Sequence, residues 1–261
     1  MKGKVKSMKK LYVFTGENKD PDGKYRALLT EQALKNGGNI VNDPADADAI
    51  AVLGGDGTVM RAARVAEEYD LPIIGINLGR IGYMAEIEKN EIPLIASFFS
   101  GNYTEDTRMT LSVTVGQNKY TALNDAVIHA KSTHMTDLTL YCNGDKVNSL
   151  RGDGLIFASP TGSTAYSMSA GGPVIDPSLD CICVTPICPQ SLSVRPMIFS
   201  PKSVLGVVAD NSDCTITVDG GEPEELSIGD TVIFKKSNRP LRMIKLKRDG
   251  FYGILRKKMS E

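Results

Sequence analysis

The first hundred residues alternate short apolar runs with longer stretches in which apolar residues recur at helical spacing. Three runs have the length and composition of buried strands: KLYVF at 10–14, AIAVL at 49–53 and PIIGIN at 72–77. Three stretches have the spacing of helices: 25–34, 57–69 and 90–100. Apolar strands alternating with helices are typical of a parallel sheet covered on both faces. An α/β domain with a parallel sheet is therefore predicted over residues 1–101.

Beyond residue 101 the pattern changes to shorter strand-like segments separated by turn residues. The strand-like segments are TRMTLSVTV, KYTALNDAVIHA, MTDLTLYC, GLIFAS and CTITVDGGEPEELSIGDTVIFKK. Turn residues at 116–118, 143–145 and 219–220 interrupt them. This predicts a mainly antiparallel β-sandwich over residues 102–248. The segment FYGILRKKM predicts a C-terminal helix at about 249–261 that packs back on the first domain.

Composition and charge narrow the possible classes of protein. The 261 residues carry a formal net charge of −1, which predicts no general attraction to nucleic acid. No apolar run approaches the roughly 18 residues of a membrane helix. The Lys-rich start lacks the apolar segment of a signal peptide. The five cysteines are odd in number and scattered, which favours reduced thiols and a cytoplasmic location.

Cys181 and Cys183 raise the question of a metal site. They lie in the strand-like run LDCICVTPI, where alternate residues face the same side. No nearby Cys or His completes a set of four ligands at a familiar spacing. Buried structural cysteines are therefore expected.

The pentapeptide GGDGT, at positions 54–58, lies where a predicted strand passes into a predicted helix. Glycines there let a phosphate approach backbone N–H groups and the positive end of the helix. The chain has no G-x-x-x-x-G-K-[ST] motif, and Met60 replaces the last glycine of G-x-G-x-x-G. Asp56 has two interpretations: it caps the helix, or it takes part in chemistry at a phosphate. Arg61, one turn later, either neutralises phosphate or lies in solvent.

Two further segments are candidates for ligand binding. GINLGRIGYMAE, at 75–86, is a second glycine-rich junction, expected at the same sheet end as the first. In the predicted β domain, Asn124 and Asp125 interrupt an apolar strand, so a ligand or a strand end is expected there. The hydroxyl-rich block over 151–177 either binds a flat base, with Tyr166 supporting the ring or sugar, or forms a polar turn.

Together these segments resemble the bacterial NAD kinase family, the ATP-NAD kinases. The resemblance is carried by GGDGT, the Asn124-Asp125 pair, Asp153-Gly154 and PTGSTAYSMSAGGP at 160–173, and less closely by TITVDGG at 215–221. It runs in order over nearly the whole chain. It implies an enzyme that transfers the γ-phosphoryl group of ATP to the 2′-hydroxyl of the adenosine ribose of NAD, giving NADP and ADP.

The resemblance also implies roles for individual residues. Asp56 matches the catalytic aspartate, and the expected ATP and phosphate contacts are Gly54, Gly55, Gly57, Thr58 and Arg61. The expected NAD contacts are Asp56, Gly57, Asn124, Asp125, His134, Arg151, Asp153, Thr164, Ala165, Tyr166, Ser167 and Ser169. Mg²⁺ or another divalent cation is expected mainly on ATP phosphates, with no protein ligand assigned. A homodimer or homotetramer that binds NAD and ATP, without a nucleic acid or membrane partner, is expected.

The sequence departs from the family pattern at two positions. Asp125 stands where many members have Glu, and Gly221 stands where many have Gln. A lipid kinase with the same glycine loop is disfavoured because no amphipathic membrane-facing stretch is seen. A protein that only senses NAD or NADP is disfavoured because it has no need of Asp56.

Overall fold

The chain divides into two units in the computed structural model, which describes residues 8–79, 82–247 and 251–260. The first unit takes in Met1–Thr107 and Leu241–Glu261, and the second takes in Arg108–Pro240. These bounds differ from the predicted ranges 1–101 and 102–248, because two strands outside the first range belong to the first sheet.

The sheet of the first unit is built mainly from parallel strands. The strands are β1 (Lys10–Thr15), β2 (Asn39–Val41), β3 (Ala49–Gly54), β4 (Ile73–Asn77), β5 (Ile87–Glu88), β6 (Thr104–Arg108) and β19 (Leu241–Lys245). They follow the order β2-β1-β3-β4-β19-β6, with β5 beside β4. β1 pairs parallel with β2 and β3, and β4 pairs parallel with β3, β5 and β19. The predicted parallel sheet is therefore confirmed.

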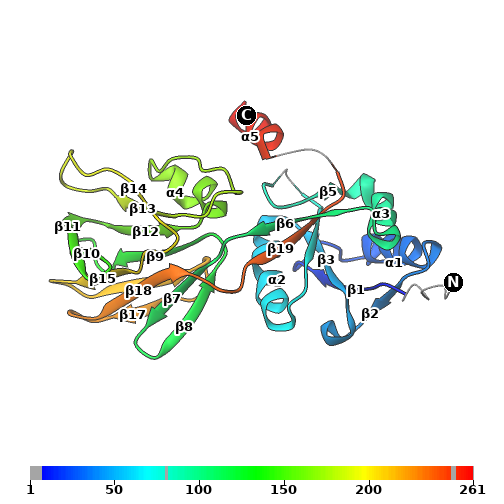
Figure 1. The fold of residues 1–261 in the computed structure, drawn as a ribbon, viewed down its shortest axis with the longest axis horizontal. Helices are drawn as coiled ribbons and strands as arrows, with labels where there is room; N and C mark the ends of the chain where they lie inside the picture. The colour runs from blue at the N-terminus through cyan, green and yellow to red at the C-terminus, as the bar shows by residue number, and fades with distance from the viewer. Residues whose placement is uncertain (1–7, 80–81, 248–250, 261) are drawn as a thin grey trace. The chain divides into compact units, whose positions relative to one another are not determined.

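Helices lie on both sides of this sheet, as the alternating pattern predicted. The helical elements of the first unit are α1 (Lys24–Lys35), α2 (Asp56–Tyr69), α3 (Ala96–Ser100), α5 (Phe251–Met259) and the 3-10 turns η1 (Pro44–Asp46) and η2 (Lys89–Ile95). Figure 1 shows α2 on one side of the sheet and α1 and α3 on the other. The helix predicted over 90–100 is divided between η2 and α3, since Pro93 has no N–H to donate.

The C-terminal helix forms where it was predicted, over a shorter range. α5 spans Phe251–Met259, and positions 249, 250 and 261 lie outside the described residues. Its basic residues stand in the last turn, where the helix dipole favours cations. The Phe251 ring lies 6.3 Å from the ring of Tyr83, which belongs to the second glycine-rich loop. The helix thus contacts a loop of the first unit.

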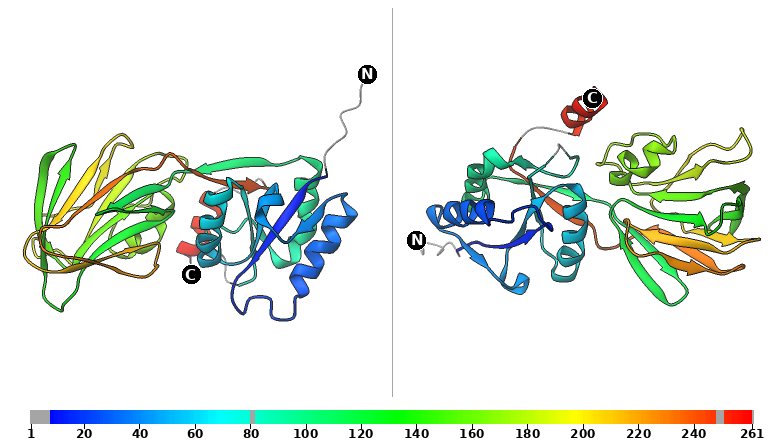
Figure 2. Two further views of the ribbon diagram at one scale, coloured as in Figure 1. Left: turned by 90° about the horizontal axis from the view of Figure 1, so that it is seen from below. Right: turned by 180° about the vertical axis from the view of Figure 1, so that it is seen from behind.

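The second unit consists of two antiparallel sheets (Figure 2). One sheet holds β7 (Leu111–Val115), β8 (Asn118–Ala122), β10 (Thr136–Cys142), β11 (Asp145–Gly152), β15 (Leu205–Ala209) and β18 (Thr231–Lys236). The other holds β9 (Asp125–Ala130), β12 (Gly154–Ala158), β13 (Ile182–Ile187), β14 (Met197–Phe199), β16 (Cys214–Val218) and β17 (Glu224–Leu226). Their orders are β11-β10-β15-β18-β7-β8 and β14-β13-β12-β9-β16-β17. The predicted β-sandwich is confirmed.

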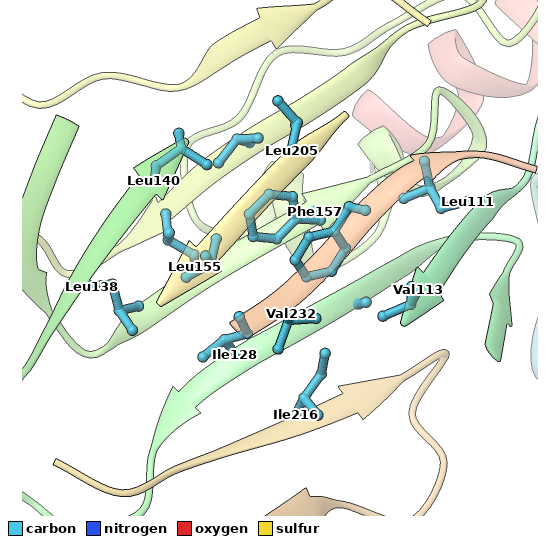
Figure 3. Close-up of a cluster of buried hydrophobic side chains, with 14 of the residues drawn as sticks. Leu111, Val113, Ile128, Leu138, Leu140, Leu155, Phe157, Leu205, Ile216 and Val232 are labelled. Atoms are coloured by element: carbon cyan, nitrogen blue, oxygen red, sulfur yellow. The ribbon is translucent and has the colours of Figure 1, made fainter. Parts of the chain in front are cut away.

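The core of the second unit lies between these two sheets. Figure 3 shows Leu111 and Val232 of one sheet packed in the same cluster as Ile128 and Phe157 of the other. The ring of Phe157 stacks on that of Phe234 with centroids 3.7 Å apart. Strands with one exposed face, such as β7, alternate buried and partly exposed residues, as the sequence does. β12 and β13 are buried at every position and read as near-continuous apolar runs.

The cysteines behave as the sequence indicated. All five are free, and Cys181, just before β13, and Cys183, within it, are buried in one apolar cluster. Burial raises the pKa of both thiols. Among the described residues, no group of three or more His, Cys, Asp or Glu side chains could hold a metal ion. The burial of Cys181 and Cys183 in an apolar cluster agrees with the expected structural role.

Candidate functional site

Asp56 stands at the junction of β3 and α2, as predicted, and its side chain does not cap its own helix. Gly55 is the N-cap residue of α2, without a side-chain cap hydrogen bond. The Asp56 carboxylate instead accepts the N–H of Tyr83 at 2.8 Å and that of Met84 at 3.0 Å. The helix-cap interpretation is therefore wrong. The carboxylate is fixed by a different loop and remains partly exposed.

The two glycine-rich junctions meet at one end of the sheet, which confirms the prediction. β3 and β4 are neighbours, and Leu78 donates its N–H to the carbonyl of Gly54 at 3.0 Å. A Cβ atom at Gly82 would lie 2.0 Å from Asp56 Oδ1, so this position must be glycine if the carboxylate is to stay in place. Residues 80 and 81 of the second loop lie outside the described residues.

The glycines of the GGDGT loop have two different roles. The buried Thr58 side chain packs beneath the loop, and a Cβ at Gly54 would lie 2.2 Å from Thr58 Oγ1. Among the described residues, no atom lies within 4 Å of a Cβ built at Gly55 or Gly57. The first N–H groups of a helix point out of its end and have no partner within the helix. Gly54 is thus needed for packing, whereas Gly55 and Gly57 leave space at the start of α2.

The second loop is held by the buried Glu86 and the partly buried Glu88. Glu86 accepts Lys245 Nζ at 2.8 Å and the N–H groups of Leu246 and Lys247 at 2.9 and 2.8 Å. Asn77 donates to both carboxylate oxygens of Glu88, at 3.1 and 3.0 Å. These contacts join β4, β5 and β19 and hold both ends of the loop that supplies the N–H donors to Asp56. The sequence alone does not reveal these contacts, because the partners are far apart along the chain.

Tyr83 lies beside Asp56, whereas the ion pair described for Arg61 is with Glu17. Burial and the charge of Asp56 raise the pKa of the Tyr83 hydroxyl. Lys258 Nζ lies 4.5 Å from the centre of the Tyr83 ring, so α5 brings a cation to this loop. Arg61 Nη1 lies 3.6 Å from Glu17 Oε1, and its side chain is about half exposed. The phosphate contact expected of Arg61 stays a prediction.

In the second unit, Asn124 and Asp125 lie at the start of β9 against the hydroxyl-rich block. Both are buried, and Asp125 is paired with Ala158 at the end of β12. Ser159 donates its N–H to the Asn124 carbonyl at 2.8 Å. A Cβ at Gly162 would lie 2.0 Å from that same oxygen. The fold thus brings together two segments that the sequence analysis marked separately.

The hydroxyl-rich block folds into η3 (Thr161–Thr164) and α4 (Tyr166–Ser169), and its side chains are divided between core and surface. Ser167 is buried, and its hydroxyl lies 2.8 Å from Thr185 Oγ1. Tyr166 is 42% exposed, and Ser169 is exposed as well. Thr164 and Ala165, between them, are partly exposed. Tyr166, Thr164, Ala165 and Ser169 are therefore accessible, whereas the Ser167 hydroxyl is used within the protein.

The surroundings of the Asp125 carboxyl group favour its protonated form. Burial, together with the nearby charge of Asp219, raises the pKa of Asp125 to about 7. The carboxylate of Asp219 accepts N–H groups from this same strand start. The sequence analysis treated Asp219 only as part of a turn. An acidic residue directly after an apolar strand was the signal available.

Three predicted NAD contacts are not brought to this strand end. Gly154, beside Asp153, pairs with His129, whereas Asp125 pairs with Ala158 at the other end of the same ladder. At about 3.3 Å per residue, the two ends of β12 are more than 10 Å apart. Arg151 Nε lies 3.8 Å from Asp137 Oδ1, and His134 is in an exposed loop before β10. Within one chain, His134, Arg151 and Asp153 therefore form a separate group.

Two domain families match the chain: the ATP-NAD kinase N-terminal domain over residues 17–103 and the ATP-NAD kinase C-terminal domain over 123–246. An NAD kinase of Thermoanaerobacter sp. (strain X514) is 39% identical over 82% of this chain and 79% of its own length. One from Natranaerobius thermophilus is 41% identical over 82% and 78%.

Two solved structures are similar as well. An NAD kinase from Archaeoglobus fulgidus in complex with ATP has a TM-score of 0.78 and 25% identity, covering 95% of this chain and 98% of that one. Yeast NADH kinase complexed with NADH has a TM-score of 0.85, covering 97% and 88%, and its 22% identity makes this a likeness of fold. No helix among the described residues is both long and apolar enough to span a membrane.

Proposed function

The chain belongs to the ATP-NAD kinase family, and we propose that it transfers the γ-phosphoryl group of ATP to the 2′-hydroxyl of the adenosine ribose of NAD. The products are NADP and ADP. The observation that carries this proposal is the Asp56 carboxylate, held by two backbone N–H groups at the open start of α2. A lipid kinase or a non-catalytic NAD sensor does not account for this residue together with the hydroxyl-rich block.

Asp56 is the proposed acceptor of the proton that leaves the 2′-hydroxyl. The ribose oxygen forms the new bond to the γ-phosphorus, and the bond from that phosphorus to the β–γ bridging oxygen breaks, leaving ADP. Phosphoryl transfer depends mainly on alignment and on stabilising charge, so a fixed carboxylate contributes by orienting the hydroxyl as well as by taking its proton. The Tyr83 and Met84 N–H groups supply that orientation.

The start of α2 is the proposed phosphate site. N–H groups and the positive end of a helix dipole favour an anion there. Gly55 and Gly57 leave room for it, while Gly54 and Thr58 shape the loop from beneath. Arg61 adds a positive charge one turn further along α2. A divalent cation such as Mg²⁺, held mainly through ATP phosphate oxygens, neutralises their charge when bound.

The second unit is proposed to bind NAD. Asn124 and Asp125 present an amide and a carboxylate that suit ribose hydroxyls and adenine nitrogens. The partly exposed Tyr166, with Thr164, Ala165 and Ser169, offers an aromatic ring and backbone groups to the adenosine. Ser167 supports this surface from within, since its hydroxyl lies against Thr185.

We infer that a second copy of the chain completes the dinucleotide site in a homodimer or homotetramer. Asp153 precedes β12 at the end of the ladder opposite to Asp125, and Arg151 and His134 lie near it on or beside β11 and β10 of the other sheet. A neighbouring copy that supplies this group would account for their matching the family's NAD contacts. A cytoplasmic location, without a nucleic acid or membrane partner, is part of the same proposal.

One coupled assay tests the function. Purified protein with Mg²⁺, ATP and NAD is expected to form NADP, measured with an NADP-specific dehydrogenase. Asp56→Asn is expected to lower turnover by about 10²- to 10⁴-fold, the usual contribution of general acid–base catalysis, while the Kd for NAD changes much less. Asp22→Asn, at an exposed acid with no role in this proposal, is the control and is expected to keep wild-type turnover.

Three outcomes contradict parts of the proposal. Undiminished turnover in Asp56→Asn removes that residue from the chemistry. NAD binding without NADP formation by the wild type favours a sensor. Phosphorylation of a diacylglycerol in place of NAD favours a lipid kinase.

A further inference from the structure

The strand start that carries Asn124 and Asp125 is held by the carboxylate of Asp219. Its Oδ2 accepts the N–H of Leu123 at 2.7 Å, and its Oδ1 accepts the N–H groups of Asn124 at 2.8 Å and Asp125 at 3.1 Å. Asp219 directly follows β16, which pairs with β9 up to Val218. A single carboxylate thus binds three successive backbone donors, in the way that a concave run of N–H groups binds an anion.

The carbonyl groups of the same three residues have partners too. The Ser159 hydroxyl donates to the Leu123 carbonyl, and the Ser159 N–H donates to that of Asn124. The Asp125 carbonyl accepts the N–H of Asp219 at 2.9 Å. All six backbone groups of residues 123–125 are therefore bonded, and Asp219 takes part in four of the six bonds: three through its carboxylate and one through its N–H.

A turn at this place does not require an acid. Asp219 has φ +50°, a conformation in which glycine or asparagine serves as well as aspartate. The acid also has a cost, because its charge acts on the buried Asp125 and raises the pKa of that residue. The three N–H bonds to its carboxylate offset this cost, since hydrogen bonds to charged groups are the strong ones. The carboxylate therefore serves the geometry of residues 123–125.

We propose that Asp219 is a positioning residue for NAD binding, whose carboxylate sets the directions of the Asn124 and Asp125 side chains. The inference rests on the proposed function, because it takes these two side chains as the groups that contact the NAD ribose and adenine. Asp219 itself need not touch NAD.

The Asp219→Asn variant tests the role while keeping the turn. Asparagine adopts the left-handed conformation readily, but its amide replaces one of the two acceptor oxygens and removes the charge. We expect the KM for NAD to rise about tenfold or more, the scale of lost charge-assisted hydrogen bonds, with the KM for ATP little changed. Asp230→Asn is the matched control: Asp230 Oδ2 accepts the Ser227 N–H at 2.8 Å in a turn of the same unit. It is expected to leave both KM values unchanged.

The pH dependence of NAD affinity provides a second measurement, which would not change if Asp219 had only a structural role. Asp219 is the charged group that raises the pKa of Asp125. The other charged side chain described nearby is the buried Arg108, whose Nη1 lies 3.4 Å from Thr161 Oγ1 of the hydroxyl-rich block. Only ionised Asp125 can accept hydrogen bonds at both oxygens. In the wild type, NAD affinity should therefore weaken as the pH falls through about 7. In Asp219→Asn the midpoint should move to lower pH, because the neighbouring negative charge is gone.

The measurements are NAD titration calorimetry between pH 5.5 and 8.5, turnover, and thermal melting. An NAD affinity of Asp219→Asn equal to that of the control overturns the inference. Equal losses in the NAD and ATP parameters with a lower Tm also overturn it, since these indicate loss of structure. If the variant does not fold, the wild-type pH profile decides, and a flat profile overturns it. A wild type that binds no NAD instead contradicts the proposed function.

Discussion

Backbone N–H groups bind the carboxylate of Asp56 in the first unit and that of Asp219 in the second, but the two contacts serve different purposes. Asp56 accepts the N–H groups of Tyr83 and Met84 from another loop, and in the proposed function this held side chain is the group that meets the ribose hydroxyl. Asp219 accepts three N–H groups of residues 123–125, and there the donors belong to the segment that is proposed to bind NAD. In one unit the loop positions the acid, and in the other the acid positions the strand.

The contrast explains why the two acids have different sequence signatures. A catalytic acid at a strand-to-helix junction is flanked by glycines, because ligand and loop must approach it closely. A positioning acid needs only the end of a strand and a left-handed turn, which many ordinary turns share. Residues that position a site are therefore harder to identify from a sequence than the residues that form the site.

Gly82→Ala should produce the largest effect, because it displaces the held acid of the first unit. The added Cβ would lie 2.0 Å from Asp56 Oδ1, so the carboxylate must move. We expect kcat to fall about 100-fold, the cost of a displacement of about 1 Å at a catalytic group. Gly79→Ala in the same loop is the control, since its Cβ would meet only Asn77 Oδ1 at 4.0 Å among the described residues. Equal kcat values for the two variants would mean that the position of Asp56 is unimportant.

Gly162→Ala should give the next largest effect, through the strand start of the second unit. Its Cβ would lie 2.0 Å from the Asn124 carbonyl oxygen, and backbone cannot move aside as a side chain can. We expect a loss of about 1–3 kcal/mol in the free energy of unfolding, as for overpacking elsewhere, with weaker NAD binding. Denaturant unfolding and calorimetry measure both. Gly206→Ala, whose Cβ would have an ordinary contact at 3.5 Å, is the control. If Gly162→Ala binds NAD with wild-type affinity, the close approach of Gly162 to the Asn124 carbonyl is not needed for NAD binding.

Tyr166→Ala should have the smallest effect, and one confined to binding. The side chain is 42% exposed, so little packing is lost on its removal. We expect NAD binding to weaken by roughly 1 kcal/mol, about fivefold in Kd, as for an aromatic contact. Tyr69→Ala, at a tyrosine that is 38% exposed in the first unit, is the control. An unchanged Kd by calorimetry would exclude Tyr166 from the adenosine contact, while a large loss of stability would assign it to the fold.

Much of the fold could be predicted because it depends on local pattern. Apolar runs of about five residues followed by helical spacing describe β1, β3, β4, α1 and α2, and alternation describes strands such as β7. The pattern did not reveal that β19 joins the first sheet, where Met243 pairs with Ile73. Pairing between residues 170 positions apart leaves no periodicity that a local reading can detect.

For the candidate site, too, some features follow from local sequence and others only from the tertiary structure. By itself the sequence determined which segments are proposed to carry the chemistry, because GGDGT, the Asn124-Asp125 pair and the block at 160–173 are contiguous motifs whose residue types limit their use. Only the tertiary structure decided what holds them. The donors to Asp56 lie 27 and 28 residues along the chain, and Asp219 lies 94 to 96 residues from the N–H groups that it binds. A hydrogen bond to a peptide N–H places no demand on the donor's side chain, so the sequence of the donors does not record it.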